Sequence, residues 1–185
     1  MSCIVAFHGS GQTETSLDPF VDAIAPGSTR FLPRGGLVEK DGFTFFRRDD
    51  DLRIDPESLL EQARLWLVKR HLSEIMLVGY SSGAIFSEAL LSLEPDRFSG
   101  AILLRPEPIA TDFRFKDMGC KPILILSGQR DERRTVEAAI TLKSQLANAN
   151  AKVTLHNLNA GHGWANNGED ICRSRQWLLD TGILV

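Results

Sequence analysis

Short apolar runs without a polar residue at every second position recur along the chain. Such runs are typical of strands buried on both faces of a parallel sheet, because polar alternation belongs to sheets with one solvated face. Segments of helical length separate the runs, and this alternation indicates an open α/β sheet with right-handed crossovers. The expected strands are residues 3–7, 29–32, 75–78, 100–104, 122–126 and 153–155.

The clearest helix start is the sequence Asp55-Pro56-Glu57. Asp55 suits the N-cap, a proline is tolerated in the first turn, and an acid is stabilised at the positive end of the helix dipole. This helix is expected to run towards residue 70. Further helices are expected at residues 82–93, 135–148 and 169–179. Residues 33–52 are irregular, and residues 43–46 within them predict an extra strand or a loop that crosses a pocket.

Length and charge bound the kind of protein. A chain of 185 residues is long enough for one domain with a substantial core, and we expect a single domain over residues 1–185. The net charge of −3 argues against nucleic acid as a partner, because binding phosphates requires clustered cations. The basic pair Arg47-Arg48 is followed directly by three aspartates, which cancel it.

The cysteines and the apolar runs indicate the cellular compartment in which the protein is expected. Cys3, Cys120 and Cys172 are too few and too scattered for a disulfide framework, so they predict reduced thiols in the cytoplasm. The first apolar run is too short for a signal peptide and has no basic residues before it, and no apolar stretch approaches membrane-spanning length. We find no spaced set of histidine, cysteine and carboxylate residues that would predict a metal site.

The segment Gly79-Tyr80-Ser81-Ser82-Gly83 joins an expected strand to an expected helix. A Gly-x-Ser-x-Gly turn in this context predicts a nucleophile elbow, in which the central residue, Ser81, presents its hydroxyl at the top of a strained turn. Ser82 would begin the helix and direct its main-chain N–H at a developing oxyanion. Taken alone the pattern is weak, because five-residue matches with three constrained positions arise by chance.

Loops after two later strands carry an aspartate and a histidine, in the chain order Ser, Asp, His of α/β-hydrolases. A serine hydroxyl is a poor nucleophile at neutral pH and requires a base, for which His162 between two glycines is the candidate. Asp131 would orient the imidazole and stabilise its charged form. The adjacent Glu132 is the alternative acid.

The turn after the first strand, His8-Gly9-Ser10-Gly11, is expected to supply the second oxyanion donor. The N–H of Ser10 is the first candidate for this donor and that of Gly11 the second, while His8 is expected to hold the turn. His71 and His156 have no partnering motif, so no catalytic role is expected for them.

Seven stretches together resemble a known family. The chain is similar to the phospholipase/carboxylesterase group of α/β-hydrolases, which includes acyl-protein thioesterases and small bacterial serine esterases. The resemblance implies a mostly parallel sheet flanked by helices, no substantial lid, no cofactor, Ser81 as nucleophile, Asp131 as acid, His162 as base, and oxyanion N–H groups from Ser10 and Ser82. The stretches are FHGSGQTE, LPRGG, GFTFFRR, VGYSSGA, FSGAILLRPEPI, ILILSGQRDE and AGHGW.

The resemblance also implies which residues lie near the substrate. Phe45, Phe46, Glu107 and Trp164 are the candidates, and the aromatic residues among them indicate a small apolar pocket for short acyl chains. Ser82 stands where the bacterial branch usually has Asn or Gln, which leaves the backbone donor intact. Glu107 stands where it often has Met, and a carboxylate there would disfavour fatty substrates.

These observations predict a serine hydrolase that cleaves small carboxylic esters through an acyl-enzyme. An acyl thioesterase or lysophospholipase remains open, because the same triad serves both reactions. A non-catalytic ligand binder of the same fold is the alternative from another class. The expected partner is a small-molecule ester, and the protein is expected to be a monomer or a homodimer.

Overall fold

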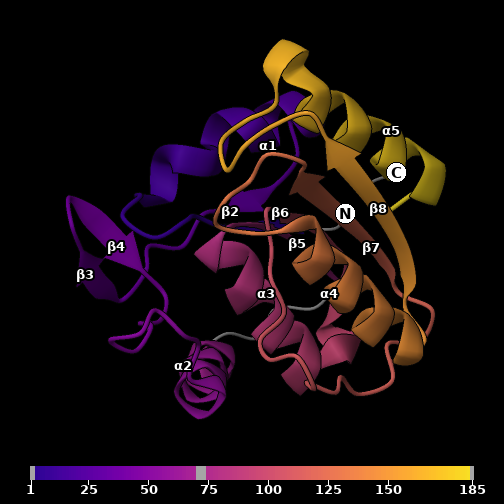
Figure 1. The fold of residues 1–185 in the computed structure, drawn as a ribbon. Coiled ribbons are helices and arrows are strands. Elements are labelled where there is room, and N and C mark those ends of the chain that lie inside the picture. The colour runs from indigo at the N-terminus through magenta and orange to yellow at the C-terminus, as the bar shows by residue number, and fades with distance from the viewer. Residues whose placement is uncertain (1–2, 70–73, 184–185) are drawn as a thin grey trace.

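The computed structural model describes residues 3–69 and 74–183. Six strands form one sheet in the order β2-β1-β5-β6-β7-β8 (Figure 1). Every neighbouring pair in this sheet is parallel, as the unalternating apolar runs predicted. The strands are β1 (Cys3–Phe7), β2 (Arg30–Phe31), β5 (Ile75–Tyr80), β6 (Phe98–Leu104), β7 (Pro122–Gly128) and β8 (Lys152–Leu158).

Helices cover both faces of the sheet (Figure 1). On one face lie α2 (Pro56–Val68), α3 (Ser82–Leu93) and α4 (Val136–Asn148), and on the other lie α1 (Asp18–Ile24) and α5 (Glu169–Thr181). Each face has its own buried apolar cluster. Short 3-10 helices are η1 (Glu14–Leu17), η2 (Pro95–Arg97) and η3 (Asn166–Gly168).

Strand β5 shows why its sequence lacks polar alternation. All six of its residues are buried. Successive side chains point to opposite faces of the sheet, and here both faces are covered. Ile75 and Leu77 therefore join the cluster under α2 to α4, while Met76 and Val78 join the cluster under α1 and α5. The side chains on each face of the strand are therefore buried, and both sets contribute hydrophobic free energy to folding.

The structure adds elements that the sequence did not predict. Helix α1 is one of them, and the hairpin of β3 (Leu37–Glu39) and β4 (Gly42–Thr44) lies in the stretch expected to be irregular. Residues 43–46 are thus divided between the end of β4 and a buried segment after it. Helix α2 ends at Val68; its expected end at residue 70 and His71 lie outside the described residues.

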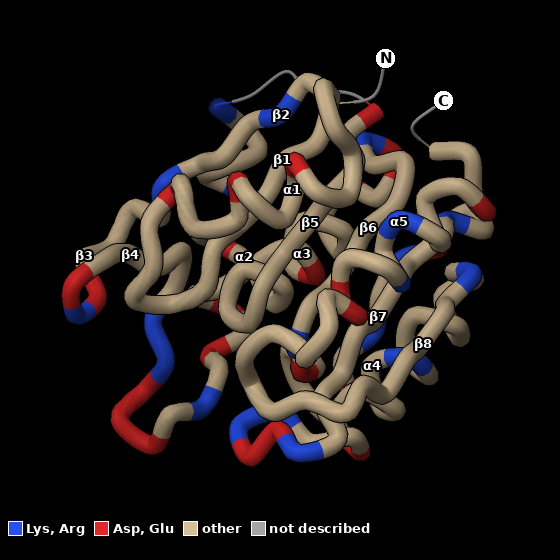
Figure 2. The backbone as a smooth tube through the Cα atoms, turned by 90° about the horizontal axis from the view of Figure 1, so that it is seen from above, with Lys and Arg blue, Asp and Glu red and all other residues tan. Residues whose placement is uncertain are grey.

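Loops from distant parts of the sequence meet at the carboxyl edge of the parallel sheet, where α/β proteins place their ligands. Two of them are strongly charged, the segments at residues 47–53 and 130–134. Figure 2 shows both at the same side of the molecule. Within residues 3–69 and 74–183, no helix is both long enough and apolar enough to cross a bilayer.

Candidate active site

The turn between β5 and α3 holds Ser81 in a conformation that L-residues rarely adopt, with φ 54° and ψ −116°. Such strain persists only where the surroundings over-determine it. The amide of Ser81 donates to the carbonyl of Leu104 at 2.8 Å. A Cβ on Gly83 would lie 2.0 Å from the carbonyl oxygen of Phe7, and one on Gly79 would lie 2.5 Å from that of Gly83. Glycines are therefore required on both sides of the serine.

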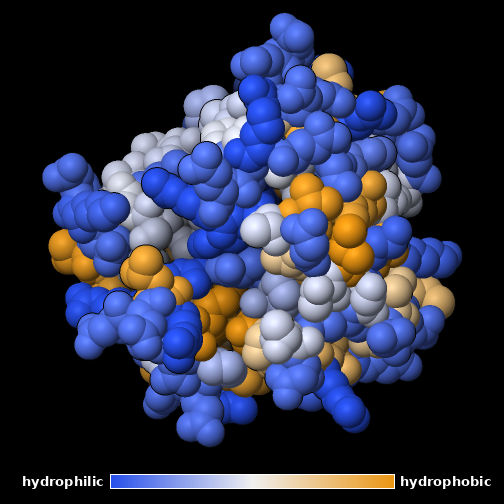
Figure 3. Space-filling view, in the orientation of Figure 1, coloured by the Kyte–Doolittle hydropathy of each residue, from blue (hydrophilic) through white to orange (hydrophobic). Residues whose placement is uncertain are grey.

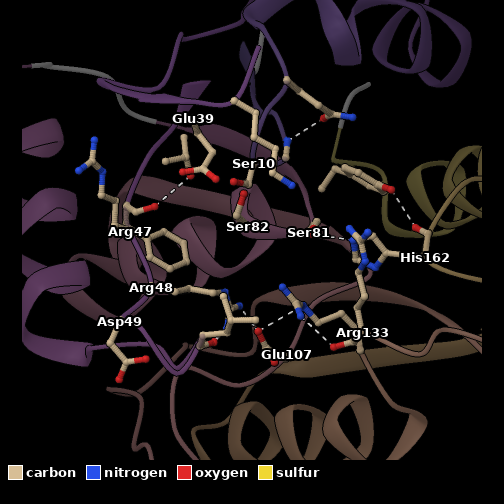
Figure 4. Close-up of a pocket in the computed structure, with 18 of the residues that line it drawn as sticks. Ser10, Glu39, Arg47, Arg48, Asp49, Ser81, Ser82, Glu107, Arg133 and His162 are labelled. Atoms are coloured by element: carbon tan, nitrogen blue, oxygen red, sulfur yellow. Dashed lines mark hydrogen bonds and ion pairs between the residues drawn. The ribbon is translucent and has the colours of Figure 1, made fainter. Parts of the chain in front are cut away.

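A continuous chain of hydrogen bonds links three side chains from three loops. Ser81 Oγ lies 2.9 Å from His162 Nε2 (Figure 4). His162 Nδ1 lies 2.8 Å from Asp131 Oδ2. The other carboxylate oxygen, Asp131 Oδ1, accepts the amide N–H groups of Arg133 and Arg134 at 2.9 and 3.0 Å. Asp131 is thus the acid that contacts the imidazole, while the alternative, Glu132, is exposed.

The surroundings of His162 favour its neutral form. Burial lowers the pKa of His162, and the hydrogen bond that its Nδ1–H donates to Asp131 acts in the opposite direction without overcoming it. The charges of Arg133 and Arg134 lower this pKa further. A neutral imidazole whose Nδ1–H is held by a carboxylate leaves Nε2 free to accept a proton from Ser81.

The turn after β1 distinguishes the two candidate oxyanion donors. The amide of Gly11 donates to the carbonyl of Phe43 at 3.1 Å, and that of Gly9 donates to Gln12 Oε1 at 2.8 Å. Within the described residues, the amide of Ser10 has no acceptor, and Ser10 lies at the cavity that contains Ser81. The bond to Phe43 therefore occupies Gly11 and leaves Ser10 as the candidate. Figure 4 shows Ser10 and Ser82 on one side of Ser81 and His162 on the other.

His8 joins this turn to the one before β3. Its Nδ1 lies 2.8 Å from the carbonyl of Gly9, and its Nε2 lies 3.1 Å from the amide nitrogen of Gly35. Because the amide of Gly35 can only donate, His8 is neutral with its proton on Nδ1. Burial lowers the pKa of His8, in agreement with this state.

A cavity of about 860 Å³ opens at the serine, and nine of the 19 residues that line it are charged. Figure 3 shows hydrophilic residues in the hollow on this face of the molecule, with hydrophobic residues at parts of its edge. The small apolar pocket expected from the sequence is therefore not what the structure shows, because the loops that carry these charges converge only in the fold. The charged lining residues are Glu39, Lys40, Arg47, Arg48, Asp49, Glu107, Glu132, Arg133 and Arg134.

Of the four expected pocket residues, Phe46 and Glu107 line the cavity. Phe45 lies in the core instead, because its ring packs against the rings of Phe7 and Phe86 with centroids 5.0 Å away in both pairs. Trp164 stacks on Tyr80 at 5.4 Å outside the cavity and stays 48% exposed.

Glu107 connects two walls of the cavity. It forms ion pairs with Arg48, from the segment after β4, and with Arg134, from the loop after β7, with an N–O distance of 3.2 Å in the second pair. Arg48 also donates to the carbonyl of Leu52 at 2.8 Å. Figure 4 shows the carboxylate of Glu107 between the two arginine-bearing segments. We call the cluster of Arg48, Glu107 and Arg134 the ionic wall of the cavity. Charged groups of this kind disfavour the burial of a long acyl chain beside them.

Sequence reasoning did not single out Arg105, which directly follows β6. Its side chain is only 1% exposed, yet it carries a charge and lies beside the loop of His162. The available signal was an arginine that immediately follows an unbroken apolar strand, a position where a charge is costly unless it is fully paired.

Glu88, in α3, is another buried residue with an ionisable side chain. Burial raises the pKa of Glu88 well above its ordinary value, with a contribution from the charge of Glu107. The native state therefore keeps a proton that the unfolded chain loses above pH ~4.5, so the free energy of unfolding falls as pH rises. From that point up to the raised pKa of Glu88 in the native state, Glu88→Gln should gain about 1.4 kcal/mol of stability relative to the parent per pH unit.

Urea unfolding of the parent and of Glu88→Gln, from pH 4 to pH 8, measures this effect. The two proteins should differ little at pH 4 and increasingly at higher pH. A difference in unfolding free energy that does not change with pH would show that Glu88 titrates normally in the native state.

The described parts of the chain, residues 3–69 and 74–183, contain no group of three or more histidine, cysteine or carboxylate side chains that could hold a metal ion. Cys3, Cys120 and Cys172 are free thiols.

The parallel sheet, the strained serine turn after β5 and the histidine loop after β8 together define the α/β-hydrolase fold. The sequence model of the dienelactone hydrolase family matches residues 48–176, and the chain belongs to that family. The expected likeness to carboxylesterase-type α/β-hydrolases is thereby confirmed, and the protein is a carboxylic ester hydrolase.

Solved structures support the same conclusion. A carboxylesterase from Mesorhizobium loti is 32% identical, with a TM-score of 0.87 over 96% of this chain and 88% of that one. The Bacillus cereus carboxylesterase is 25% identical, with a TM-score of 0.87 over 97% of this chain and 88% of that one. The protein MhqD of Bacillus subtilis (strain 168) is 25% identical in an alignment that covers 94% of this chain and 90% of MhqD.

Proposed function

We propose that the protein is a serine esterase that cleaves small carboxylic esters through an acyl-enzyme, with Ser81 as nucleophile, His162 as base and Asp131 as the orienting acid. The observation that carries the proposal is the unbroken hydrogen-bond chain from Ser81 Oγ through His162 to Asp131, at 2.9 and 2.8 Å, on a strained turn. Nucleophile and base within hydrogen-bond reach, and a third group that orients the base, are the requirements of this chemistry.

In the proposed reaction Ser81 Oγ attacks the acyl carbon while His162 Nε2 takes the hydroxyl proton. The amides of Ser10 and Ser82 donate to the tetrahedral oxyanion. His162 then protonates the leaving alcohol, and Asp131 stabilises the imidazolium in between. Water, deprotonated by the same histidine, hydrolyses the acyl-enzyme and regenerates the serine.

The substrate class follows from the lining of the cavity. Phe46 offers an apolar contact near the serine, but the ionic wall around Glu107 limits the apolar surface that an acyl chain can reach. We therefore propose short acyl groups. An acyl thioesterase remains the alternative, and oxygen esters and thioesters with the same acyl group would separate the two.

A non-catalytic binder has less support. A binder has no need to keep the serine within hydrogen-bond distance of the imidazole, and here that distance is 2.9 Å.

The free thiols Cys3, Cys120 and Cys172 support the proposal of a reducing, cytoplasmic location.

The direct test is labelling of the purified protein with a fluorophosphonate, followed by turnover of p-nitrophenyl esters from acetate to octanoate. We expect labelling, and a kcat/KM that is highest for the shorter acyl chains. A folded protein that is neither labelled nor active on any ester would contradict the esterase proposal.

The pH dependence of kcat/KM tests the role of His162. The imidazole acts as a base only when it is neutral, and its pKa lies below the ordinary value of 6.5 because the side chain is buried. Activity should therefore persist below pH 6.5 and fall as the pH drops through the lowered pKa. A pH profile of p-nitrophenyl acetate hydrolysis measures this, and an acid limb centred above 6.5 would be inconsistent with the buried, neutral base.

A further inference from the structure

The side chain of Arg105 is the largest that is fully buried in the described parts of the molecule. A buried charge is costly unless it is paired and hydrogen-bonded throughout, so a buried guanidinium with complete partners requires an explanation. The backbone of Arg105 is also unusual, with φ 52° and an amide that donates to the carbonyl of Leu126 at 2.8 Å.

All five N–H donors of this guanidinium have an acceptor. Two of its bonds reach the residues on either side of His162: Nε donates to the carbonyl of Gly161 at 3.1 Å, and Nη2 donates to that of Gly163 at 2.9 Å. A third bond joins Nη1 to the carbonyl of Leu126 at 3.1 Å. One planar group thus connects strand β7 to both neighbours of the candidate base.

Asp170, in the first turn of α5, holds the guanidinium in place. Its two carboxylate oxygens accept from Nη1 and Nη2 of Arg105 at 2.8 and 3.2 Å, and the carboxylate is 2% exposed. Such a bidentate contact restrains the plane of the guanidinium. Asp170 also accepts the amide N–H of Ala165 at 2.6 Å, which ties the end of the histidine loop to the same pair.

Before the histidine, the loop is held by Arg130, whose amide donates to the carbonyl of Ala160 at 2.9 Å, but side chains pack little around residues 161–163. Glycine is conformationally permissive, and His162 lies between two of them. A Cβ on Gly163 would meet nothing within 4 Å, and one on Gly161 would meet only the carbonyl of Arg130 at 3.6 Å, so side-chain packing at these positions is sparse. The remaining carbonyl, that of His162, accepts the hydroxyl of Tyr80 at 2.8 Å.

We propose that Arg105, anchored by Asp170, is the positioning residue for His162: by binding the carbonyls of Gly161 and Gly163 it holds the imidazole between Ser81 and Asp131. The inference rests on the proposed function, because it assigns a role relative to the base. Arg105 touches neither the serine nor the cavity, and it acts through the backbone of the loop. A displacement of about 1 Å in a reacting group can reduce turnover by on the order of a hundredfold.

Three substitutions test the proposal, with Arg173→Met as the matched control. Arg105→Met keeps the length of the side chain without its donors, Arg105→Lys keeps the charge but has a single donor group, and Asp170→Asn weakens the anchor while leaving Arg105 present. Arg173 pairs with Glu169 on the exposed side of α5 at 3.3 Å, so its loss removes an arginine–carboxylate pair away from the loop.

For each variant, kcat and KM for p-nitrophenyl acetate are measured separately, together with the deshielded proton NMR resonance of the His162–Asp131 hydrogen bond and the thermal midpoint. We expect kcat to fall about a hundredfold or more in Arg105→Met and Asp170→Asn, with KM changed less than about threefold. In Arg105→Met and Asp170→Asn, the NMR resonance should be lost or broadened at temperatures well below the melting temperature of each variant. Arg105→Lys should retain an intermediate kcat, and Arg173→Met should behave as the parent.

Variants that melt at lower temperature but keep the parental kcat and the NMR resonance would overturn the proposal, because Arg105 would then be structural only. If Arg105→Met does not fold, Asp170→Asn and Arg105→Lys still decide the question. A parent protein without esterase activity would contradict the proposed function alone, since the NMR resonance reports the position of His162 without any turnover.

Discussion

Replacing Ser81 with alanine is expected to abolish fluorophosphonate labelling and to lower kcat for p-nitrophenyl esters by on the order of 10⁴ to 10⁶-fold. The reason is that Ser81 Oγ is the oxygen within 2.9 Å of the candidate base, so no other atom can form the acyl-enzyme in its place. The activity that remains should be that of bound substrate beside the oxyanion donors. Labelling and steady-state kinetics on the purified variant measure both effects.

The neighbouring serine provides the matched control. Ser82→Ala removes a buried hydroxyl, but it keeps the main-chain N–H that the proposed mechanism uses. This variant should still be labelled, with kcat within about tenfold of the parent, because losing an oxyanion N–H itself would cost a hundredfold or more. Labelling that survives in Ser81→Ala and disappears in Ser82→Ala would assign the nucleophile to the other serine.

Replacing Gly83 with alanine is expected to have the largest effect on stability. Alanine is the better helix former by about 1 kcal/mol, so helix propensity alone predicts a gain. The added Cβ, however, would lie 2.0 Å from the carbonyl oxygen of Phe7, which belongs to the neighbouring strand and has no side-chain freedom to yield. We expect a net loss of about 3 kcal/mol or more in the free energy of unfolding, measured by urea denaturation.

Gly36→Ala is the control for this substitution. Gly36 is exposed, and a Cβ there would meet nothing within 4 Å. This change should leave the free energy of unfolding within about 0.5 kcal/mol of the parent. Equal stability of the two variants would mean that helix α3 can move away from β1, and that the close contact at the serine turn is not required.

Several features were predictable because they depend on neighbours in the sequence. Apolar runs in β5, β6 and β7 specified buried parallel strands, and Asp55 with Pro56 specified the start of α2, where the carboxylate caps the amides of Glu57 and Ser58. Ser81, Asp131 and His162 each follow an expected strand, and this position predicted all three on loops at one edge of the sheet. Their hydrogen-bonded contact in the structure agrees with that placement.

The cavity was less predictable, because its lining comes from segments far apart in the sequence. Arg48, Glu107 and Arg134 look like separate surface charges along the chain, but the fold brings them together in one ionic wall. Phe45 and Trp164, by contrast, were expected at the cavity but are placed elsewhere by the fold. Both are aromatic residues near the expected site, yet one packs in the core and the other stacks on Tyr80 outside the cavity.

The choice between neighbouring candidates also depended on the fold. The sequence placed Ser10 before Gly11 as the candidate oxyanion donor, and the bond from Gly11 to Phe43 on β4 supports that order. Asp131 and Glu132 are adjacent acids, and the turn of the backbone decides which one meets His162.

The sequence by itself determined the parallel sheet, the serine turn and the order of the three candidate catalytic residues, because strand burial and turn chemistry depend on residues a few positions apart. Only the tertiary structure decided the charged residues that line the cavity, which of the two candidate oxyanion amides is free of an intramolecular acceptor, and the contacts of Arg105 with the histidine loop. Each of these depends on groups that lie tens of residues apart, such as Arg105 and Asp170, and their contact exists only after the sheet and its helices have packed.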